Sequence, residues 1–325
     1  MTHSRLWFAI AALIFVAGCG GKAGNAAVSA NTPATASSLD RQDQAPPAQQ
    51  TGGFDGQRAY NYTAKLVSFG PHPSGSDSIK QTQNYIYSEL HADGCQVGLD
   101  NFHAQTPVGT IAMQNIIAKV PGTKKGMILL MTHYDTKRLA DFVGAEDGGS
   151  STGLMLEMAH QLCHQKPQLA IWMAFLDGEE AVVDWDKDND HTYGSRELAA
   201  RMELDGDLKD VKAVVLADMI GQKGLTMKKE SSSTPWLVDL IWSTAAKLGY
   251  QNVFVSQSTS ASDDHDPFLE QKVPAADLID LDDYIAEGYW HTPQDTMDKI
   301  SAKNLAIVGH VIVASVDALE KKFAQ

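Results

Sequence analysis

The sequence is short of positive charge, of long hydrophobic runs and of cysteine. Lysine and arginine number 26 against 40 aspartates and glutamates, so the net charge of −14 argues against nucleic acid and anionic membrane surfaces as partners. The apolar run Leu6–Val16 is too short for a good membrane span, which needs about 20 residues. The chain does contain 43% hydrophobic residues, enough for a sizeable core in one large domain or two small ones.

Three cysteines are present, Cys19, Cys95 and Cys163. In an oxidising compartment Cys95 and Cys163 could form one disulfide. Two buried free thiols are the alternative, because nothing in the sequence brings these two residues together. The sequence leaves both arrangements open, whereas Cys19 has a distinctive context.

The N-terminal segment predicts a targeting signal. Arg5 supplies a positive start, Leu6–Val16 forms the apolar core, and the small residues Ala17 and Gly18 precede Cys19. This arrangement resembles the bacterial lipoprotein signal, in which the cysteine becomes the lipidated first residue. An ordinary cleaved secretory signal with an incidental cysteine is the alternative. We expect residues 1–18 to be a lipoprotein signal peptide and Cys19 to be the lipidation site.

Residues 19–54 predict a flexible tether. They are rich in Ala, Gly, Ser, Thr, Gln and Pro and show no apolar periodicity. About 34 such residues span roughly 30 Å root-mean-square, which would hold a domain off a bilayer. Gly20 follows Cys19, which by resemblance to bacterial sorting signals suggests the outer membrane. We expect a protein anchored in the bacterial envelope by lipid alone, at the outer membrane and facing the periplasm.

Strand-like and helix-like segments alternate after residue 54, without a second linker or an internal repeat. Continuous apolar runs, typical of strands buried on both faces, occupy residues 127–131, 169–176, 213–216 and 275–281. Antiparallel strands are predicted at 95–102 and 110–120. Helical spacing covers residues 60–69, 79–90, 152–163, 195–202, 236–248 and 305–323. The alternation predicts one α/β domain over residues 55–325, with a mixed, mostly parallel sheet flanked by helices.

The chain is organised around the run Leu169–Leu176 and the residues that follow it. The eight apolar residues show no alternation and stop abruptly at Asp177-Gly178-Glu179-Glu180. Open α/β sheets place ligands beyond the carboxyl ends of their strands. A pair of glutamates alone is usually a solvated turn, so the argument for a site depends on what the other strand ends carry.

Acidic residues and histidines lie at or just beyond several of the predicted strand ends. They are His133, Asp147, Glu179, Glu180, Asp218, Asp263 and His291. Imidazole and carboxylate together suit zinc, which in a catalytic site takes three protein ligands and keeps one position open. The collection of these residues at one edge of one sheet indicates a zinc-dependent active site.

Three other histidines are interpreted as structural or surface residues. His72 lies in a loop rich in proline and glycine, where a structural role is commoner than a catalytic one. His160 and His164 have an i,i+4 spacing that could hold zinc, but no acidic residue or cysteine flanks them on that helix face. We therefore expect His160 and His164 on the surface.

With these residues in place, the sequence resembles the zinc aminopeptidase superfamily and, within it, the glutaminyl cyclase branch, especially the animal-type enzymes. The resemblance runs from about Tyr60 to the C-terminus. The segments that carry it are Asp177-Gly178-Glu179-Glu180-Ala181, Trp185, Tyr193–Ala200, Ser262–Leu269, Val273-Pro274 and Trp290-His291-Thr292. It implies an enzyme that converts the N-terminal glutamine of peptides and proteins to pyroglutamate and releases ammonia.

The resemblance also implies a role for each site residue. Asp147, Glu180 and His291 match the zinc ligands. Glu179 matches the general acid/base, and Asp218 and Asp263 match the supporting acids. Trp185 and Trp290 match the walls of the pocket.

The chemistry of cyclisation requires such a set. Zinc would polarise the γ-carboxamide oxygen, and Glu179 would take the ammonium proton and return it to the departing amide nitrogen. Asp218 and Asp263, if close, should share a proton, because adjacent carboxylates resist double ionisation. The substrate supplies its own nucleophile, so we expect one zinc per chain, with His133 left as an orienting residue.

The sequence departs from the animal-type pattern at three positions. Gly148 follows Asp147 where the animal enzymes carry serine, which removes a hydroxyl from the acid network. Thr132 and Thr152 stand where those enzymes have a disulfide near the active site. None of these changes touches an expected zinc ligand.

Two other functions stay open. The first is a two-zinc aminopeptidase with Glu179 activating water, and its five ligands are His133, Asp147, Glu180, Asp218 and His291. Trp185 and Trp290 weigh against it because they narrow the pocket. The second is a non-catalytic lipoprotein that binds zinc or peptide, and the presence of Glu179 weighs against that function.

Overall fold

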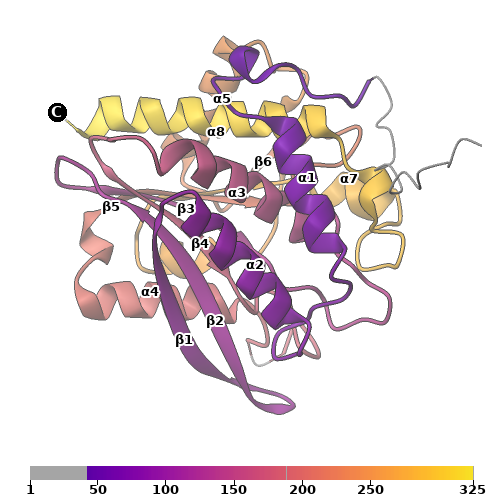
Figure 1. Cartoon of the computed structure of the whole chain (residues 1–325). Coiled ribbons are helices and arrows are strands. Elements are labelled where there is room, and N and C mark those ends of the chain that lie inside the picture. The colour runs from indigo at the N-terminus through magenta and orange to yellow at the C-terminus, as the bar shows by residue number, and fades with distance from the viewer. Residues whose placement is uncertain (1–41, 188, 325) are drawn as a thin grey trace, which may run out of the picture. The chain divides into compact units, whose positions relative to one another are not determined.

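The computed structural model describes residues 42–187 and 189–324 (Figure 1). The expected signal peptide (1–18), the lipidation site Cys19 and most of the expected tether lie outside the described residues. The last part of that tether, residues 42–54, packs on the domain. Phe54 is fully buried against Gly309, and the amide of Lys303 donates to the carbonyl of Asp43 at 3.0 Å. The folded part therefore begins upstream of the boundary expected at residue 55.

A six-stranded sheet forms the centre of the domain (Figure 1). In spatial order its strands are β1 (Gln96–Thr106), β2 (Gly109–Val120), β4 (Ala170–Leu176), β3 (Met127–His133), β5 (Val211–Asp218) and β8 (Ala275–Ile279). The strands β4, β3, β5 and β8 pair in parallel, whereas β1–β2 and β2–β4 are antiparallel pairs. This confirms the predicted mixed, mostly parallel sheet.

Helices cover both faces of the sheet. They are α1 (Gly56–Val67), α2 (Ile79–Ala92), α3 (Gly149–Leu162), α4 (Tyr193–Asp205), α5 (Pro235–Lys247), α6 (Asp266–Glu270), α7 (Leu281–Ala286) and α8 (Ala302–Phe323), with short 3₁₀ turns at Ala48–Gln50, Leu208–Asp210 and Met297–Lys299. Ile128 and Leu130 of β3 pack in the core with α1, α3 and α8, whereas Leu129 and Met131 pack in the core with α4. Because every residue of the strand is buried on one face or the other, the sequence shows a continuous apolar run.

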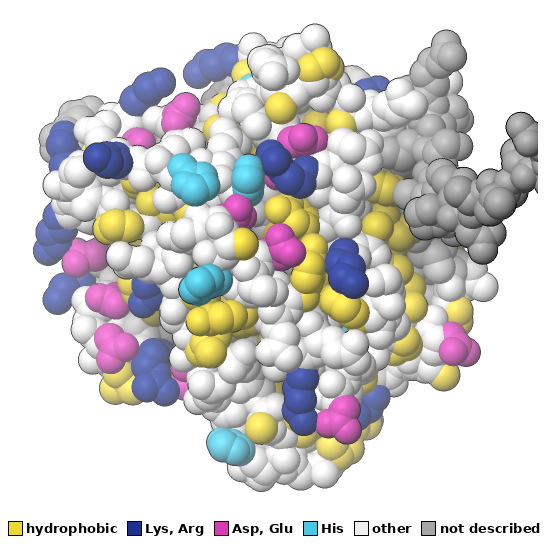
Figure 2. All heavy atoms as spheres, in the orientation of Figure 1, with side chains coloured by type: hydrophobic (Ala, Val, Ile, Leu, Met, Phe, Trp, Pro, Cys, Tyr) yellow, Lys and Arg dark blue, Asp and Glu magenta, His cyan; other side chains and the backbone are white. Residues whose placement is uncertain are grey.

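The helix α8 is the one helix in the described part of the chain that is long and apolar enough to cross a membrane. Most of its apolar window is buried, and it packs against α1 and α5. It is therefore a core helix of this domain. On the side shown in Figure 2, basic and acidic side chains are interspersed over a mostly uncharged surface.

Two short strands and two short helices were missing from the prediction. The strands β6 (Met227–Glu230) and β7 (Phe254–Thr259) form a separate parallel pair. Only the first and last residues of each of these strands are buried, so neither shows the alternation or the apolar run that marks a strand. The helices α6 and α7 are too short to show a helical period.

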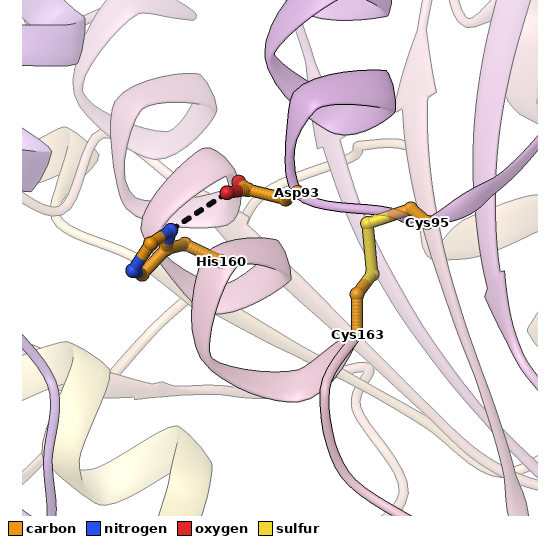
Figure 3. Close-up of a disulfide and its surroundings, with 4 residues drawn as sticks. All are labelled: Asp93, Cys95, His160 and Cys163. Carbon is orange, nitrogen blue, oxygen red and sulfur yellow. Dashed lines mark hydrogen bonds and ion pairs between the residues drawn. A yellow bond between two sulfur atoms is a disulfide. The ribbon is translucent and has the colours of Figure 1, made fainter.

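A disulfide joins Cys95, before β1, to Cys163, directly after α3 (Figure 3). It settles the alternative that the sequence left open. Beside it, Asp93 and His160 form an ion pair with 2.7 Å between Oδ1 and Nδ1 (Figure 3). The acidic partner of His160 is 67 residues away in the sequence and not on the same helix, so the pattern of its own helix could not reveal it. His164 is exposed, as expected.

Candidate active site

A cavity of about 310 Å³ lies at the carboxyl edge of the parallel strands. All eight residues expected at the site line it: Asp147, Glu179, Glu180, Trp185, Asp218, Asp263, Trp290 and His291. They come from segments up to 144 residues apart, between Asp147 and His291. The fold brings them together because β3, β4, β5 and β8 run in the same direction and end at the same edge.

Asp147, Glu180 and His291 form one group suited to a metal ion. Nε2 of His291 lies 3.3 Å from an oxygen of each carboxylate, and the three ligand atoms are within 4.8 Å of one another. Burial alone would lower the pKa of His291, but the carboxylates of Asp147 and Glu180 raise it to about 9. Oδ2 of Asp147 and both carboxylate oxygens of Glu180 are buried and accept no hydrogen bond, and Nζ of Lys137 forms an ion pair with Oε2 of Glu180 at 3.3 Å. Buried carboxylates need positive charge nearby, and the two carboxylates with the imidazole are a donor set that fits zinc.

His133, Asp147 and Asp218 form a second group of the same kind. Nε2 of His133 lies 3.1 Å from Oδ1 of Asp218 and 3.3 Å from Oδ1 of Asp147. Burial would lower the pKa of His133, but the charge of Asp218 and hydrogen bonds to Asp135, Asp147 and Asp218 raise it well above its usual value. His133 is fully buried and contributes nothing to the cavity lining.

Among the described residues, no hydrogen bond joins the carboxyl groups of Asp218 and Asp263, which were expected to share a proton. Asp218 is bonded to His133, and Oδ1 of Asp263 accepts from the amide of Asp264 at 2.5 Å. The two carboxylates still interact through charge: burial, followed by Asp277 and Asp218, raises the pKa of Asp263 well above its usual value. The shared proton was expected only for two close carboxylates, and the hydrogen-bond partner of Asp218 in the fold is His133.

Glu179 and Glu180 are held by Asp135, to which the sequence assigned no role. Its carboxylate accepts from the amide of Glu179 at 3.1 Å and from that of Glu180 at 3.4 Å. Gly178 turns the chain at φ +75°, and a Cβ there would lie 2.6 Å from the sulfur of Met113, so only glycine fits. Burial raises the pKa of Glu179 well above its usual value against the opposing charge of His133.

The two tryptophans that line the cavity each stack on a histidine. Trp185 stacks on His191 with ring centroids 4.0 Å apart and planes 9° apart, and Trp290 stacks on His291 at 3.9 Å and 22°. Trp290 is 37% exposed. Sequence reasoning missed His191, although its position in the short loop after Trp185 was a usable signal.

The three positions at which the sequence departs from the animal-type pattern have local structural explanations. Gly148 adopts φ +80°, and a Cβ there would lie 2.9 Å from Cε1 of His133, so a serine would be strained in this backbone. Thr152 donates a hydrogen bond to the carbonyl of His133 at 2.7 Å, and Thr132 donates to Ser151 at 2.7 Å. Hydrogen bonds therefore join β3 to α3 where the animal-type pattern has a disulfide.

His72 is not part of the cavity. It is 4% exposed, and its Nδ1 lies 2.6 Å from the carbonyl oxygen of Gly70. Burial lowers its pKa below the usual value. These contacts support the structural role expected from the sequence.

Comparison with known proteins identifies the relatives of this chain. Peptidase family M28 matches residues 115–316. The glutaminyl-peptide cyclotransferase of Drosophila melanogaster is 27% identical over 269 residues, which are 73% of this chain and 75% of the relative. The crystal structure of an Acidobacteriales bacterium glutaminyl cyclase is 39% identical with a TM-score of 0.78, covering 83% of this chain and 96% of that one.

Two further solved structures are informative. The Porphyromonas gingivalis glutaminyl cyclase is 31% identical with a TM-score of 0.76, over 82% of this chain and 98% of that one. A leucine aminopeptidase precursor from Bacteroides thetaiotaomicron is 27% identical with a TM-score of 0.73, covering 81% of this chain and 97% of that one. The M28 match spans well over half of this chain, and these two cyclase structures have higher identities than the aminopeptidase precursor. The chain therefore belongs to peptidase family M28 and, within it, to the glutaminyl cyclases.

Proposed function

We propose that this protein converts the N-terminal glutamine of peptides and proteins to pyroglutamate and releases ammonia. The observation that carries the proposal is that all eight expected site residues line one cavity. The similarity to solved glutaminyl cyclases supports it. At about 310 Å³ the cavity is near the lower end for ligand pockets, which suits a single N-terminal side chain.

Zinc held by Asp147, Glu180 and His291 would supply the electrophilic polarisation of the γ-carboxamide. The neutral α-amine nitrogen would bond to the δ-carbon of the same residue, and Glu179 would take the proton that this nitrogen loses when it becomes the ring amide. The bond from that carbon to the amide nitrogen breaks, and Glu179 returns its proton to the leaving group, giving ammonia. The raised pKa of Glu179 suits such an acid and base at neutral pH.

The remaining cavity residues bind and orient the substrate. Trp185 and Trp290 would enclose the short neutral side chain and exclude water. The carboxyl of Asp263, whose pKa burial raises well above its usual value, would contact the leaving nitrogen. Nucleophile and electrophile belong to one residue, so binding has only to select the folded side-chain conformer.

We propose one zinc per chain, bound by Asp147, Glu180 and His291. These three residues line the cavity, whereas His133 lies behind it. The alternative is a two-zinc aminopeptidase, which the second group of His133, Asp147 and Asp218 and the similar aminopeptidase precursor favour. A purely zinc- or peptide-binding lipoprotein has less support, because Glu179 is present and buried in the site.

Parallel assays on peptides that begin with glutamine and with leucine test the function. We expect ammonia and a cyclised peptide from the first and no free amino acid from the second. If leucine is released from the leucine peptide and the glutamine peptide yields no ammonia, the chain is an aminopeptidase. The fold assignment would still hold.

We also propose that Cys19 carries a lipid that anchors the protein at the outer membrane, facing the periplasm. The support is the sequence of residues 1–20 alone. Cys19→Ser should leave the protein unprocessed or release it from the membrane fraction. Unchanged membrane attachment and processing of this variant would contradict the proposal.

A further inference from the structure

Asp295 is a buried carboxylate that holds the backbone of the zinc-ligand loop. It is fully buried, and its two oxygens accept from the amides of Glu146 at 2.8 Å and Asp147 at 3.2 Å. The hydroxyl of Tyr284, also fully buried, donates to Oδ1 of Asp295 at 2.6 Å. Asp295 thus makes three hydrogen bonds, and two of them fix the segment that carries a ligand.

The position of Asp295 in the chain couples two ligands. It lies four residues after His291, so one short segment carries both a zinc ligand and the carboxylate that grips the backbone of Asp147. The same loop is held from a second side, where the amide of Gly221 donates to both carboxylate oxygens of Glu146 at 2.8 and 3.1 Å. Moving Asp295 would therefore change the separation between Asp147 and His291.

We propose that Asp295 and Tyr284 are a positioning pair that sets the zinc affinity of the site by fixing Asp147 relative to His291. The inference rests on the proposed zinc site but not on the reaction that the site performs. Residues that orient metal ligands through hydrogen bonds typically contribute 10–100-fold to metal affinity. We expect a loss of about this size when the carboxylate of Asp295 is removed.

The chain contains a matched control in Asp190 and Tyr193. Asp190 is fully buried and accepts from the amides of Val182, Val183 and Asp184 at 3.3, 2.7 and 3.0 Å. The hydroxyl of Tyr193 donates to its Oδ1 at 2.7 Å. This pair has the same chemistry as Asp295 and Tyr284, but the amides that it holds lie between Glu180 and Trp185 and belong to no zinc ligand.

The two carboxylates differ in their neighbours. Burial raises the pKa of Asp295 to about 7, with the charge of Asp147 adding to it. Burial also acts to raise the pKa of Asp190, but the hydrogen bonds from Tyr193 and the backbone outweigh it, so that pKa lies below its usual value. Asp295 therefore lies near the carboxylate of Asp147, whereas the environment of Asp190 is dominated by hydrogen-bond donors.

The test measures zinc affinity by competition with a chelator, together with the melting temperature of the zinc-free protein. D295A should lower zinc affinity about 10–100-fold, and Y284F should lower it by less because both amide bonds to Asp295 remain. D295N, which keeps one acceptor oxygen, should fall between D295A and the parent protein. D190A and Y193F should keep the zinc affinity of the parent and raise the KM for peptide.

Two results would overturn the proposal. Zinc affinity equal to that of the parent in both D295A and Y284F would remove the positioning role. An equal loss of zinc affinity in D190A and D295A would show a general effect of disturbing a buried aspartate. If D295A does not fold, Y284F compared with Y193F decides the question. Zinc affinity is measured without turnover, so the result can be interpreted even if the protein does not catalyse the proposed cyclisation.

Discussion

The floor and the rim of the cavity are built by different means. The floor, Asp147, Glu179, Glu180 and Asp218, is 3–7% exposed and lies at or beside strand ends and helix starts. The rim, Trp185 and Trp290, is partly exposed and lies on loops. Three floor residues are fixed through their backbones by Asp135 and Asp295, and the fourth, Asp218, is fixed by the hydrogen bond between its side chain and His133. Rim residues are fixed by stacking on imidazoles.

This difference indicates that the floor and the rim have different functions. Groups fixed by several hydrogen bonds in a dry environment can be placed accurately enough for metal binding and proton transfer. Side chains held by stacking on exposed loops can adjust to the substrate. We therefore expect changes in the floor to act on metal content and kcat, and changes in the rim to act on KM.

The largest expected effect is at the two neighbouring glutamates of the floor. Glu179→Gln should keep zinc and lose a factor of about 10²–10⁴ in kcat, the usual contribution of a general acid/base. Glu180→Gln should lose zinc affinity itself. Metal analysis and rates on both variants check this, and equal zinc loss in the two would show that the roles are wrongly assigned.

The disulfide between Cys95 and Cys163 should affect stability and neither part of the cavity. It closes a loop of 68 residues at the end of α3 away from Asp147. Replacing both cysteines by serine should reduce the free energy of unfolding by about 2–4 kcal/mol. Denaturant titration measures this, and kcat and KM at a temperature where both proteins are folded should match. A change in kcat would show that the two ends of α3 are coupled.

The pH dependence of kcat/KM should be set by the substrate amine and by Glu179 in the floor. The α-amine of the substrate has an ordinary pKa of about 7.7–8.0 and attacks only when neutral, so kcat/KM should rise between about pH 6 and 8. The raised pKa of Glu179 acts in the same direction, because a base must lose its proton before it can accept one. A rate that is flat or falls across this interval would contradict the mechanism. The rim variants should show the same profile as the parent.

The smallest effect is expected at His191, which braces the rim. His191→Ala removes the ring that stacks on Trp185, and an aromatic pair contributes about 0.5–1.5 kcal/mol, equivalent to a rise in KM of about 2–10-fold. His191→Phe keeps a ring and should restore most of the affinity. Steady-state kinetics on both variants measure it. A fall in kcat with KM unchanged in His191→Ala would break the separation between floor and rim.

The sequence predicted the parts of the molecule whose residues repeat a simple pattern. The central strands were predictable because residues such as Leu129 and Leu130 must both be apolar when the two faces of a strand are buried. The strands β6 and β7 were not, because only their end residues are buried and their middle residues are partly or fully exposed. The eight cavity residues were predictable from the resemblance, since each lies within a recognisable motif.

The supporting contacts were harder to predict because they join residues that are distant in the sequence. Asp295 is 148 residues from the amide of Asp147 that it accepts from, and His160 is 67 residues from Asp93. The partner of Asp218 was missed for the same reason: His133 is 85 residues away in the sequence, and only the fold brings the two together. Motifs identify the groups that react, whereas the fold identifies the groups that hold them.

The most direct test of this account is the metal content of the purified protein, measured together with its reaction on peptides that begin with glutamine and with leucine. We predict one tightly bound zinc per chain, ammonia from the glutamine peptide and no leucine from the other. Two tightly bound zincs with hydrolysis of the leucine peptide would contradict it. The group formed by His133, Asp147 and Asp218 would then be a second metal site.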